Sequence, residues 1–507
     1  MLGKVISTPD SPSPTKFMFV IEKGKKVHKD QFVKVETEEG TLVAIVDNII
    51  KTNRYYARAE SVVEAENLEG LFPIDEWEFL MGEATPLGVI ADVVRRPTLP
   101  PSPGALVEEV DRKLLSSFLG LSEDGITIGN VLHHDIPASF SLNKLFQKHL
   151  AILAMSGAGK SYLTSVMIEE LLNRSREQGR PSLVIFDVHG EYVGFAEKPP
   201  SGYEDFSGRC IAVRDVVIPA PELSAREISL FVPMSPAQVS ELSKLLKEME
   251  GKRYNFEELA DYVSRSKINP KTKEALVRWL VDLHSTGLFG EEEKIIAWRE
   301  NEKPEVYRLR ELLRPGVGVI IDLSKYIDAK SRHIIALWIA KKIFNMRRRD
   351  EIPPTIIFLE EAHNFIPEGV SREAAPAKSI FETIAREGRK FLCSLVVISQ
   401  RPLRLSTTVL SQCNTHIIMR ITNPYDLRHI AESSEGITGR TLDSITTLQV
   451  GEALVVGEAS RYPVFIRVRE RRSWEKKSAD MESEAKRFEE RMEGEEAERE
   501  DYMEAFL

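Results

Sequence analysis

Hydrophobic and polar residues follow two different patterns along this chain, and the change between them falls near residue 100. Before that point, apolar and polar residues alternate in short runs at 16–21, 32–37 and 41–46, separated by Lys-Gly and Glu-Gly turns. Such runs are typical of a small antiparallel β-barrel. Residues 96–104, RPTLPPSPG, then form a proline-rich break that lacks the backbone donors a central strand needs. We therefore predict a barrel domain over residues 1–100.

Beyond the break, the pattern is that of strands alternating with longer helices, which indicates an α/β fold with a parallel sheet. Brief apolar runs predict strands at residues 183–186, 317–321, 356–359, 395–398 and 416–419. Apolar residues at helical spacing predict a helical insertion at 235–290. This insertion divides the α/β domain into residues 101–234 and 291–472.

The C-terminal segment, residues 473–507, is almost wholly charged. It carries Met481, Ala485, Phe488 and Met492 at helical intervals. This pattern predicts a solvated helix or tail, and the weak apolar face allows a second interpretation as a contact with a partner.

Residues 149–162, HLAILAMSGAGKSY, are the most informative segment, because a short apolar strand meets a glycine-rich loop and then a helix. Glycines allow the backbone to curl so that successive amides point at phosphate oxygens, and the helix N-terminus adds partial positive charge. Lys160 would reach the β and γ phosphates, and the Ser161 hydroxyl would bind Mg²⁺. The pattern predicts an ATP site formed by Ser156, Gly157, Ala158, Gly159, Lys160, Ser161 and Tyr162. An ordinary strand-to-helix turn is the alternative.

One position departs from the usual phosphate-loop pattern. Ala154 stands where that pattern has its first glycine. Because this position lies at the exit of the strand, alanine costs little there if its φ stays negative.

Two adjacent carboxylates follow the strand at 356–359, at the sheet edge where ligands bind in open α/β folds. We expect Glu360 to act in the outer shell of Mg²⁺, and Glu361 to orient or deprotonate the attacking water. Aspartate is commoner at the first of these positions, so Glu360 is a second departure from the pattern. A solvated pair of glutamates at a strand end is the alternative.

Three further residues near strand ends complete the candidate site. Asp187 follows an apolar strand and would face the γ-phosphate or its water, unless it only forms the next turn. Gln400 follows residues 395–398 and would sense the γ-phosphate through a hydrogen bond, unless it is a strand-end residue without that duty. Arg386 precedes the same strand. It suits stabilisation of transition-state charge in a neighbour's site, contact with nucleic-acid phosphates, or a solvated helix end.

Composition and charge exclude several classes of protein. The chain has 507 residues, enough for two to four domains, and no apolar run long enough to span a bilayer. Its N-terminus lacks the features of a secretory signal, so we expect a cytoplasmic protein without membrane association. The three cysteines lack metal-ligand spacing, which indicates neither disulfides nor a zinc site. A net charge of −10 argues against a surface that is basic throughout but allows a local basic channel.

In their order along the chain, these motifs resemble those of the HerA family, within the HerA–FtsK class of ring ATPases. The motifs are PPSPG at 100–104, ITIG at 126–129, HLAIL at 149–153, DVHGEY at 187–192, VIIDLS at 319–324, EEAH at 360–363 and SQRP at 399–402. The resemblance covers most of the chain and implies a RecA-like P-loop NTPase core behind a HAS-type β-barrel. It also implies a homo-hexameric ring, double-stranded DNA in its pore and a NurA-type nuclease as partner. By position, Arg386 matches the family's arginine finger, which acts on the next subunit.

The resemblance implies an ATP-driven double-stranded DNA translocase or helicase that acts in end resection, double-strand break repair and homologous recombination. Two other functions stay open. One is a ring ATPase that pumps another polymer, either protein or single-stranded nucleic acid. The other is a nucleotide-gated scaffold for a nuclease, in which the altered site hydrolyses ATP slowly.

Overall fold

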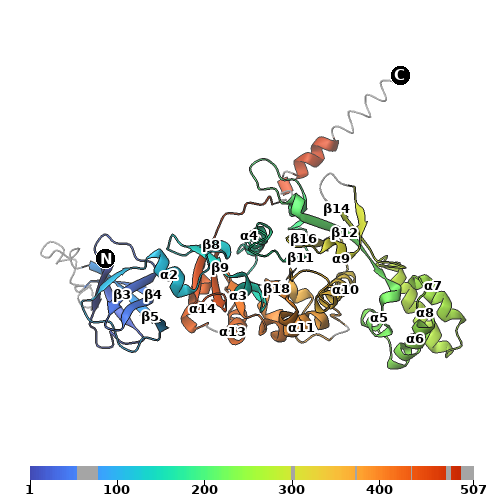
Figure 1. The fold of residues 1–507 in the computed structure, drawn as a ribbon, viewed down its shortest axis with the longest axis horizontal. Helices are drawn as coiled ribbons and strands as arrows, with labels where there is room; N and C mark the ends of the chain where they lie inside the picture. Colours follow the sequence, from blue (N-terminus) through green and yellow to red (C-terminus); the bar gives the residue numbers. More distant parts are fainter. Residues whose placement is uncertain are drawn as a thin grey trace, which may run out of the picture.

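The computed structural model describes residues 1–53, 78–298, 303–371, 374–434, 437–475, 481–482 and 484–492. Figure 1 shows a barrel at one end of the long axis, an α/β core in the middle and a helical insertion at the other end. No helix in the described ranges is long and apolar enough to cross a membrane.

The N-terminal domain is a closed barrel of six antiparallel strands, as predicted. The strand order is β2-β1-β7-β3-β4-β5, and pairing of β2 with β5 closes it. Alternate residues of each strand face inward, as Phe17, Phe19 and Ile21 do in β2. The strands are β1 (Gly3–Ile6), β2 (Phe17–Ile21), β3 (Phe32–Thr37), β4 (Gly40–Asn53), β5 (Glu78–Ile90) and β7 (Leu106–Glu109), with the short β6 (Val94–Arg95) beside β5.

The barrel extends past the boundary predicted at residue 100. Strand β7 follows the proline-rich break and pairs with both β1 and β3. The break therefore forms a loop between two barrel strands and does not mark the exit from the domain. Prolines exclude a central strand locally, but they do not prevent the chain from returning to the same sheet.

The core contains seven consecutive parallel strands, and the five predicted strands are among them. All seven end at the same edge of the sheet, where ligands bind in folds of this kind. In spatial order they are β12 (Cys210–Pro219), β16 (Gly318–Asp322), β11 (Ser182–Asp187), β17 (Thr355–Leu359), β18 (Cys393–Ser399), β10 (Leu150–Leu153) and β19 (Thr415–Ile418).

Antiparallel strands extend this sheet on both sides, and the apolar runs did not predict them. One side carries β14 (Lys294–Trp298) and β15 (Glu305–Tyr307). The two-residue β13 (Phe289–Gly290) lies beside β12 and pairs with it in parallel. The other side carries β20 (Glu452–Gly457), β21 (Val464–Val468), β8 (Ile126–Val131) and β9 (Pro137–Phe140). Strand β8 pairs with β21, which follows it by more than 300 residues, so local sequence could not indicate this contact.

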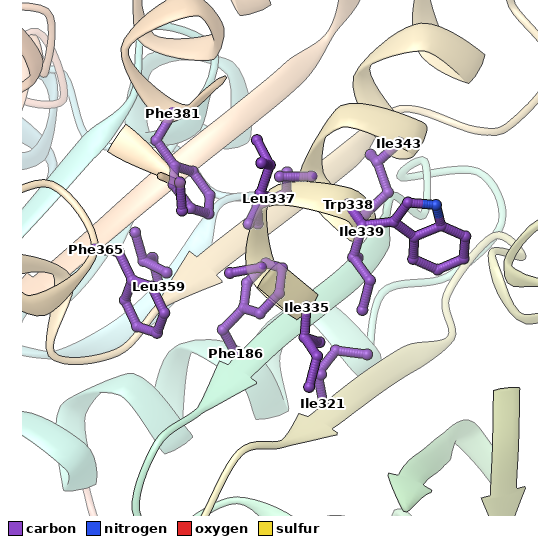
Figure 2. Close-up of a cluster of buried hydrophobic side chains, with 14 of the residues drawn as sticks. Phe186, Ile321, Ile335, Leu337, Trp338, Ile339, Ile343, Leu359, Phe365 and Phe381 are labelled. Atoms are coloured by element: carbon purple, nitrogen blue, oxygen red, sulfur yellow. The ribbon is translucent and has the colours of Figure 1, made fainter. Parts of the chain in front are cut away.

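Helices cover both faces of the parallel strands. Consecutive residues of β17 serve opposite faces: Phe358 packs in the cluster of α4 (Lys160–Leu172), and Leu359 packs in the cluster of α10 (Ala329–Arg348) and α11 (Lys378–Glu387). Figure 2 shows the second cluster, where side chains of α10 lie over β11, β16 and β17. Burial on both faces explains why these strands are continuous apolar runs.

The helical insertion lies between β12 and β14. It contains α6 (Pro236–Glu248), α7 (Phe256–Arg265) and α8 (Pro270–Ser285), in the range predicted to be helical, and α5 (Ala225–Phe231) before them. Capping boxes at Ser224, Ser235 and Asn255 fix the starts of α5, α6 and α7. The helical segment begins ten residues before the predicted start at 235, because a seven-residue helix is too short to give a periodic signal. The remaining helices are α2 (Arg112–Leu119), α3 (Leu142–Phe146), α9 (Leu309–Leu312), α12 (Thr407–Leu410), α13 (Pro424–Ser433) and α14 (Gly439–Thr447).

The barrel is joined to the core by apolar packing and by a half-buried histidine. Phe32 and Val43 of the barrel belong to the same cluster as Phe118, whose ring stacks on Tyr462 with centroids 4.5 Å apart. The backbone N–H of Phe32 donates to Nε2 of His134, in the turn between β8 and β9, over 3.1 Å. Burial, with a smaller contribution from His133, lowers the pKa of His134 from 6.5 to about 4.

We expect this histidine to make the barrel junction sensitive to acid. Because the pKa is lower in the folded state, the unfolded chain binds more protons between pH 6.5 and 4, and stability is lost as the pH falls through that window. At pH 5 the loss from this one group is about 2 kcal/mol. Calorimetry of the barrel transition at pH 7 and pH 5 measures it. His134→Gln keeps a hydrogen-bond acceptor but does not titrate, so it should reduce the loss of stability between pH 7 and pH 5. An unchanged loss in that variant would contradict the assignment.

The C-terminal segment differs from the predicted tail at its beginning. Ser473, the first residue of the predicted tail, is buried against the core. Residues 481–482 and 484–492 are helical, and Met481, Phe488 and Met492 are exposed. The predicted helix is therefore present in the described part of the tail, with its weak apolar face in solvent.

Candidate functional site

The glycine-rich loop joins β10 to α4. Gly157 and Gly159 have φ values of 76° and 101°, a left-handed conformation that favours glycine. A Cβ at Gly159 would lie 3.2 Å from the Met419 side chain, so space is also limited there. Ala154 is not among the residues with positive φ, and its amide donates to the carbonyl of Ser399 over 3.2 Å. The condition under which alanine is tolerated at this position is therefore met.

The parallel register places several polar residues side by side at the carboxyl edge. Asp187 of β11 lies opposite Asp322 of β16, and Phe186 lies opposite Leu359, directly before Glu360. On the other side of β17, β18 ends at Ser399, opposite Leu153 of the phosphate-loop strand. Residues from β11, β17, β18 and β10 therefore converge on one short stretch of the edge.

A buried ion pair forms the centre of this stretch. Nζ of Lys160 lies 2.6 Å from Oε1 of Glu361, and their side chains are 10% and 4% exposed. Glu361 has φ 46° and ψ 45°, an uncommon left-handed conformation for a residue with a side chain. Strain of this kind costs roughly 1–3 kcal/mol and is concentrated at functional sites.

His363 lies beside the second oxygen of the Glu361 carboxylate. Its Nδ1 lies 3.2 Å from Oε2 of Glu361 and 3.1 Å from Oγ of Ser399, which also accepts from the amide of Arg401. Burial lowers the pKa of His363, although the charge of Glu361 opposes this. The Glu361 carboxylate is thus held through Oε1 by Lys160, whereas Oε2 lies beside His363 without a hydrogen-bond donor among the described residues.

Glu360 points to the opposite side of the same strand end. Its Oε2 accepts from the amide of Val188 over 2.9 Å, whereas its Oε1 is buried and has no hydrogen-bond donor among the described residues. Burial, and then the nearby charges of Asp187 and Glu191, raise the pKa of Glu360 well above its ordinary value.

Asp187 is engaged by its own loop. Its Oδ1 accepts from the amides of Gly190 and Glu191, and its Oδ2 accepts from the amide of Tyr192, over 2.8–3.0 Å. Burial raises the pKa of Asp187 to about 6 despite these bonds. Because both oxygens hold the turn after β11, the geometry favours the turn-forming alternative over contact with the γ-phosphate.

Gln400 and Arg386 lie at opposite edges of the sheet. Gln400 is half-buried directly after β18, next to the strand that enters the phosphate loop. Arg386 is exposed in the last turn of α11, before Gly388, which packs against the carbonyl of Cys393 at the start of β18. The length of β10 therefore separates Arg386 from the loop of its own chain, roughly 10 Å at the usual rise per strand residue.

The contact between the end of the core and the phosphate-loop helix was not predicted from the sequence. Residues 469–474, which we call the C-terminal strap, lie along α4. Oε1 of Glu169 accepts from the amides of Arg472 and Ser473 and from the Ser473 hydroxyl, and Oε2 lies 2.8 Å from Nη1 of Arg469. The Glu169 side chain is completely buried. The adjacent glutamates Glu169 and Glu170, between apolar residues of α4, were the available signal.

Comparisons with known proteins agree with this arrangement. A family model described as the central domain of helicase HerA matches residues 126–343. A probable helicase of Methanocaldococcus jannaschii is 27% identical, and the match covers 89% of this chain and 87% of that protein. The DNA double-strand break repair helicase HerA of Pyrococcus furiosus is 28% identical, with 90% of each chain covered. Among solved structures, VirB4 of Thermoanaerobacter pseudethanolicus has a TM-score of 0.50 at 16% identity, covering 69% of this chain and 97% of that one.

The fold and the phosphate loop define a P-loop ATPase with a RecA-like core, a helical insertion and an N-terminal barrel. The family match covers the segment from β8 through most of α10, which includes the loop and its helix. In this segment the chain is similar to the central domain of HerA helicases, and most of its length is similar to proteins named HerA.

Proposed function

We propose that this chain is the ATP-driven motor of a hexameric ring that moves double-stranded DNA and acts with a NurA-type nuclease in the repair of DNA breaks. One observation carries the enzymatic part: the 2.6 Å contact between Lys160 of the phosphate loop and Glu361, which follows the end of β17. It brings a phosphate-binding cation and a candidate base to one point. The DNA part is supported by relatives that are named DNA double-strand break repair helicases.

Hydrolysis would begin with an exchange of partners. The loop amides and the N-terminus of α4 would hold the phosphates, and Lys160 would turn from Glu361 to the β and γ phosphates. The carboxylate of Glu361 would then accept a proton from water as its oxygen attacks the γ-phosphorus. The bond from phosphorus to the β–γ bridging oxygen breaks, and its electron pair leaves with ADP. Gln400, beside the loop, would hydrogen-bond the γ-phosphate or the water.

The residues present also suit Mg²⁺. Ser161 offers a hydroxyl and Glu360 offers the buried oxygen that lacks a donor among the described residues. Within the described ranges, His, Cys, Asp and Glu side chains do not gather into a metal-binding group of three or more. Mg²⁺ does not need such a group, because it is usually held by one or two protein groups, phosphates and water. Bound there, the ion would neutralise charge on the phosphate oxygens.

Arg386 would act on the nucleotide of the next subunit. Its exposure leaves it available at the molecular surface, and its position at the amino edge keeps it away from the loop of its own chain. An arginine that reaches a neighbour's γ-phosphate couples hydrolysis to assembly of the ring. The barrel would serve assembly or docking of the nuclease, because its described strands carry no phosphate loop.

Duplex DNA should stimulate ATP hydrolysis severalfold, and adding the nuclease should change the stimulated rate. The measurement is the steady-state ATPase rate with and without blunt duplex DNA, with single-stranded DNA and an unfolded polypeptide as matched controls. Stimulation by a control polymer but not by the duplex would favour a motor for another polymer. A slow rate that no polymer changes, in a chain that binds both ATP and the nuclease, would favour a nucleotide-gated scaffold.

A further inference from the structure

Two exposed apolar side chains lie beside the phosphate loop without a role in the hydrolysis described above. Tyr162 directly follows Ser161 in the first turn of α4 and is 37% exposed. Val450 is 63% exposed, and the amide of the next residue, Gly451, donates to the carbonyl of Ala158 in the loop over 3.4 Å. One apolar group therefore comes from the phosphate-loop helix and the other from the segment before β20.

The Tyr162 ring is held in place from outside its helix. Its hydroxyl accepts from the amide of Arg471 in the C-terminal strap over 2.6 Å. The strap is fixed two turns further along α4 by Glu169, and the guanidinium of Arg471 lies 5.6 Å from the ring centroid of Phe195. An exposed aromatic ring with its far end anchored loses little conformational freedom when a ligand covers it.

The phosphate loop determines where the rest of a nucleotide must lie. The loop and the start of the helix bind the phosphates through backbone amides, and the nucleoside extends outward from the α-phosphate. The α-phosphate lies nearest the amides that follow the lysine, which places the nucleoside beside Tyr162. Bases bind readily to aromatic rings, because every base has a π-face.

We propose that Tyr162 and Val450 form the nucleoside-binding wall of the ATP site, with the C-terminal strap holding the tyrosine ring for stacking against the purine. This inference rests on the proposed nucleotide site and adds the part of the ligand that each residue would recognise. The strap also connects the bound nucleoside to the segment that leads into the C-terminal helix.

Binding of ATP and of inorganic tripolyphosphate, each with Mg²⁺, tests the wall separately from the loop. Tyr162→Ala should weaken ATP binding about tenfold, within the range measured for base stacking on aromatic residues, and should leave tripolyphosphate binding within about twofold. Tyr162→Phe, which keeps the ring but loses the hydroxyl that the strap holds, should weaken ATP binding less than Tyr162→Ala does. Val450→Ser should weaken ATP binding in the same selective way by a smaller factor. Tyr262→Ala, in the helical insertion, is the matched control and should change neither affinity.

The two ligands also separate the possible failures. Equal losses for ATP and tripolyphosphate, or no loss of ATP affinity in both Tyr162→Ala and Val450→Ser, would overturn the nucleoside wall and leave the phosphate site standing. A wild-type protein that binds neither ligand would overturn the proposed nucleotide site itself. Tripolyphosphate binding reports that the loop of each variant is folded, and Val450→Ser provides a second test at an exposed position if Tyr162→Ala does not fold.

Discussion

Replacing Glu361 by glutamine should stop ATP hydrolysis while leaving ATP bound. Glutamine keeps the shape of the side chain and an oxygen that can accept from Lys160, but it cannot take a proton from water. General-base catalysis contributes about 10²- to 10⁴-fold in rate, so we expect a loss of that size. Single-turnover hydrolysis and equilibrium binding of ATP measure the two effects separately.

The control for this variant is Glu458→Gln, a partly exposed glutamate that pairs with Lys148 on the surface. It should hydrolyse ATP normally. If Glu361→Gln turned over ATP at the wild-type rate, the base would have to be another group and the contact with Lys160 would be structural only.

Replacing Lys160 by alanine should instead abolish tight binding of ATP. The lysine belongs to the phosphate loop, where it would form a buried charge pair with the ATP phosphates. Truncating one member of such a pair costs about 2–5 kcal/mol of binding free energy. We therefore expect ATP affinity to fall at least about 30-fold. Isothermal titration with ATP measures the loss, and Lys148→Ala, which removes a partly exposed lysine, is the matched control.

The same variant tests the proposed action of Arg386 across subunits. Rings of Lys160→Ala alone and rings of Arg386→Ala alone should both be inactive, since arginine fingers contribute about 10³- to 10⁵-fold. Mixed rings contain interfaces where an intact loop faces an intact arginine, so part of the activity should return. If Arg386→Ala rings hydrolyse ATP normally and only bind DNA more weakly, the arginine contacts phosphates of the nucleic acid, and Arg389 or Arg401 becomes the better candidate for the finger.

Features that depend on neighbouring residues were readable from the sequence. The phosphate loop was predictable because glycines at 157 and 159 adopt the positive φ values that a phosphate-binding turn requires. The five predicted strands of the parallel sheet were predictable because burial on both faces makes each a short apolar run. The barrel followed from period-two runs, although the return of β7 after the prolines did not.

Features that depend on distant residues were decided only by the tertiary structure. The assignment of Glu360 and Glu361 to opposite sides of one strand end depends on the left-handed backbone of Glu361 and on what surrounds each side chain. Asp187 had two interpretations in the sequence, and the amides of residues 190–192 favour one of them.

The sequence by itself determined the class of this protein, because the phosphate loop, the strand-end carboxylates and the order of the motifs are local patterns. Only the tertiary structure decided which of those groups meet. The contact of Lys160 with Glu361 joins residues 201 positions apart, and the strap joins Arg471 to Tyr162 across 309 positions. Such pairs are brought together by strand order and helix packing, which no local periodicity specifies.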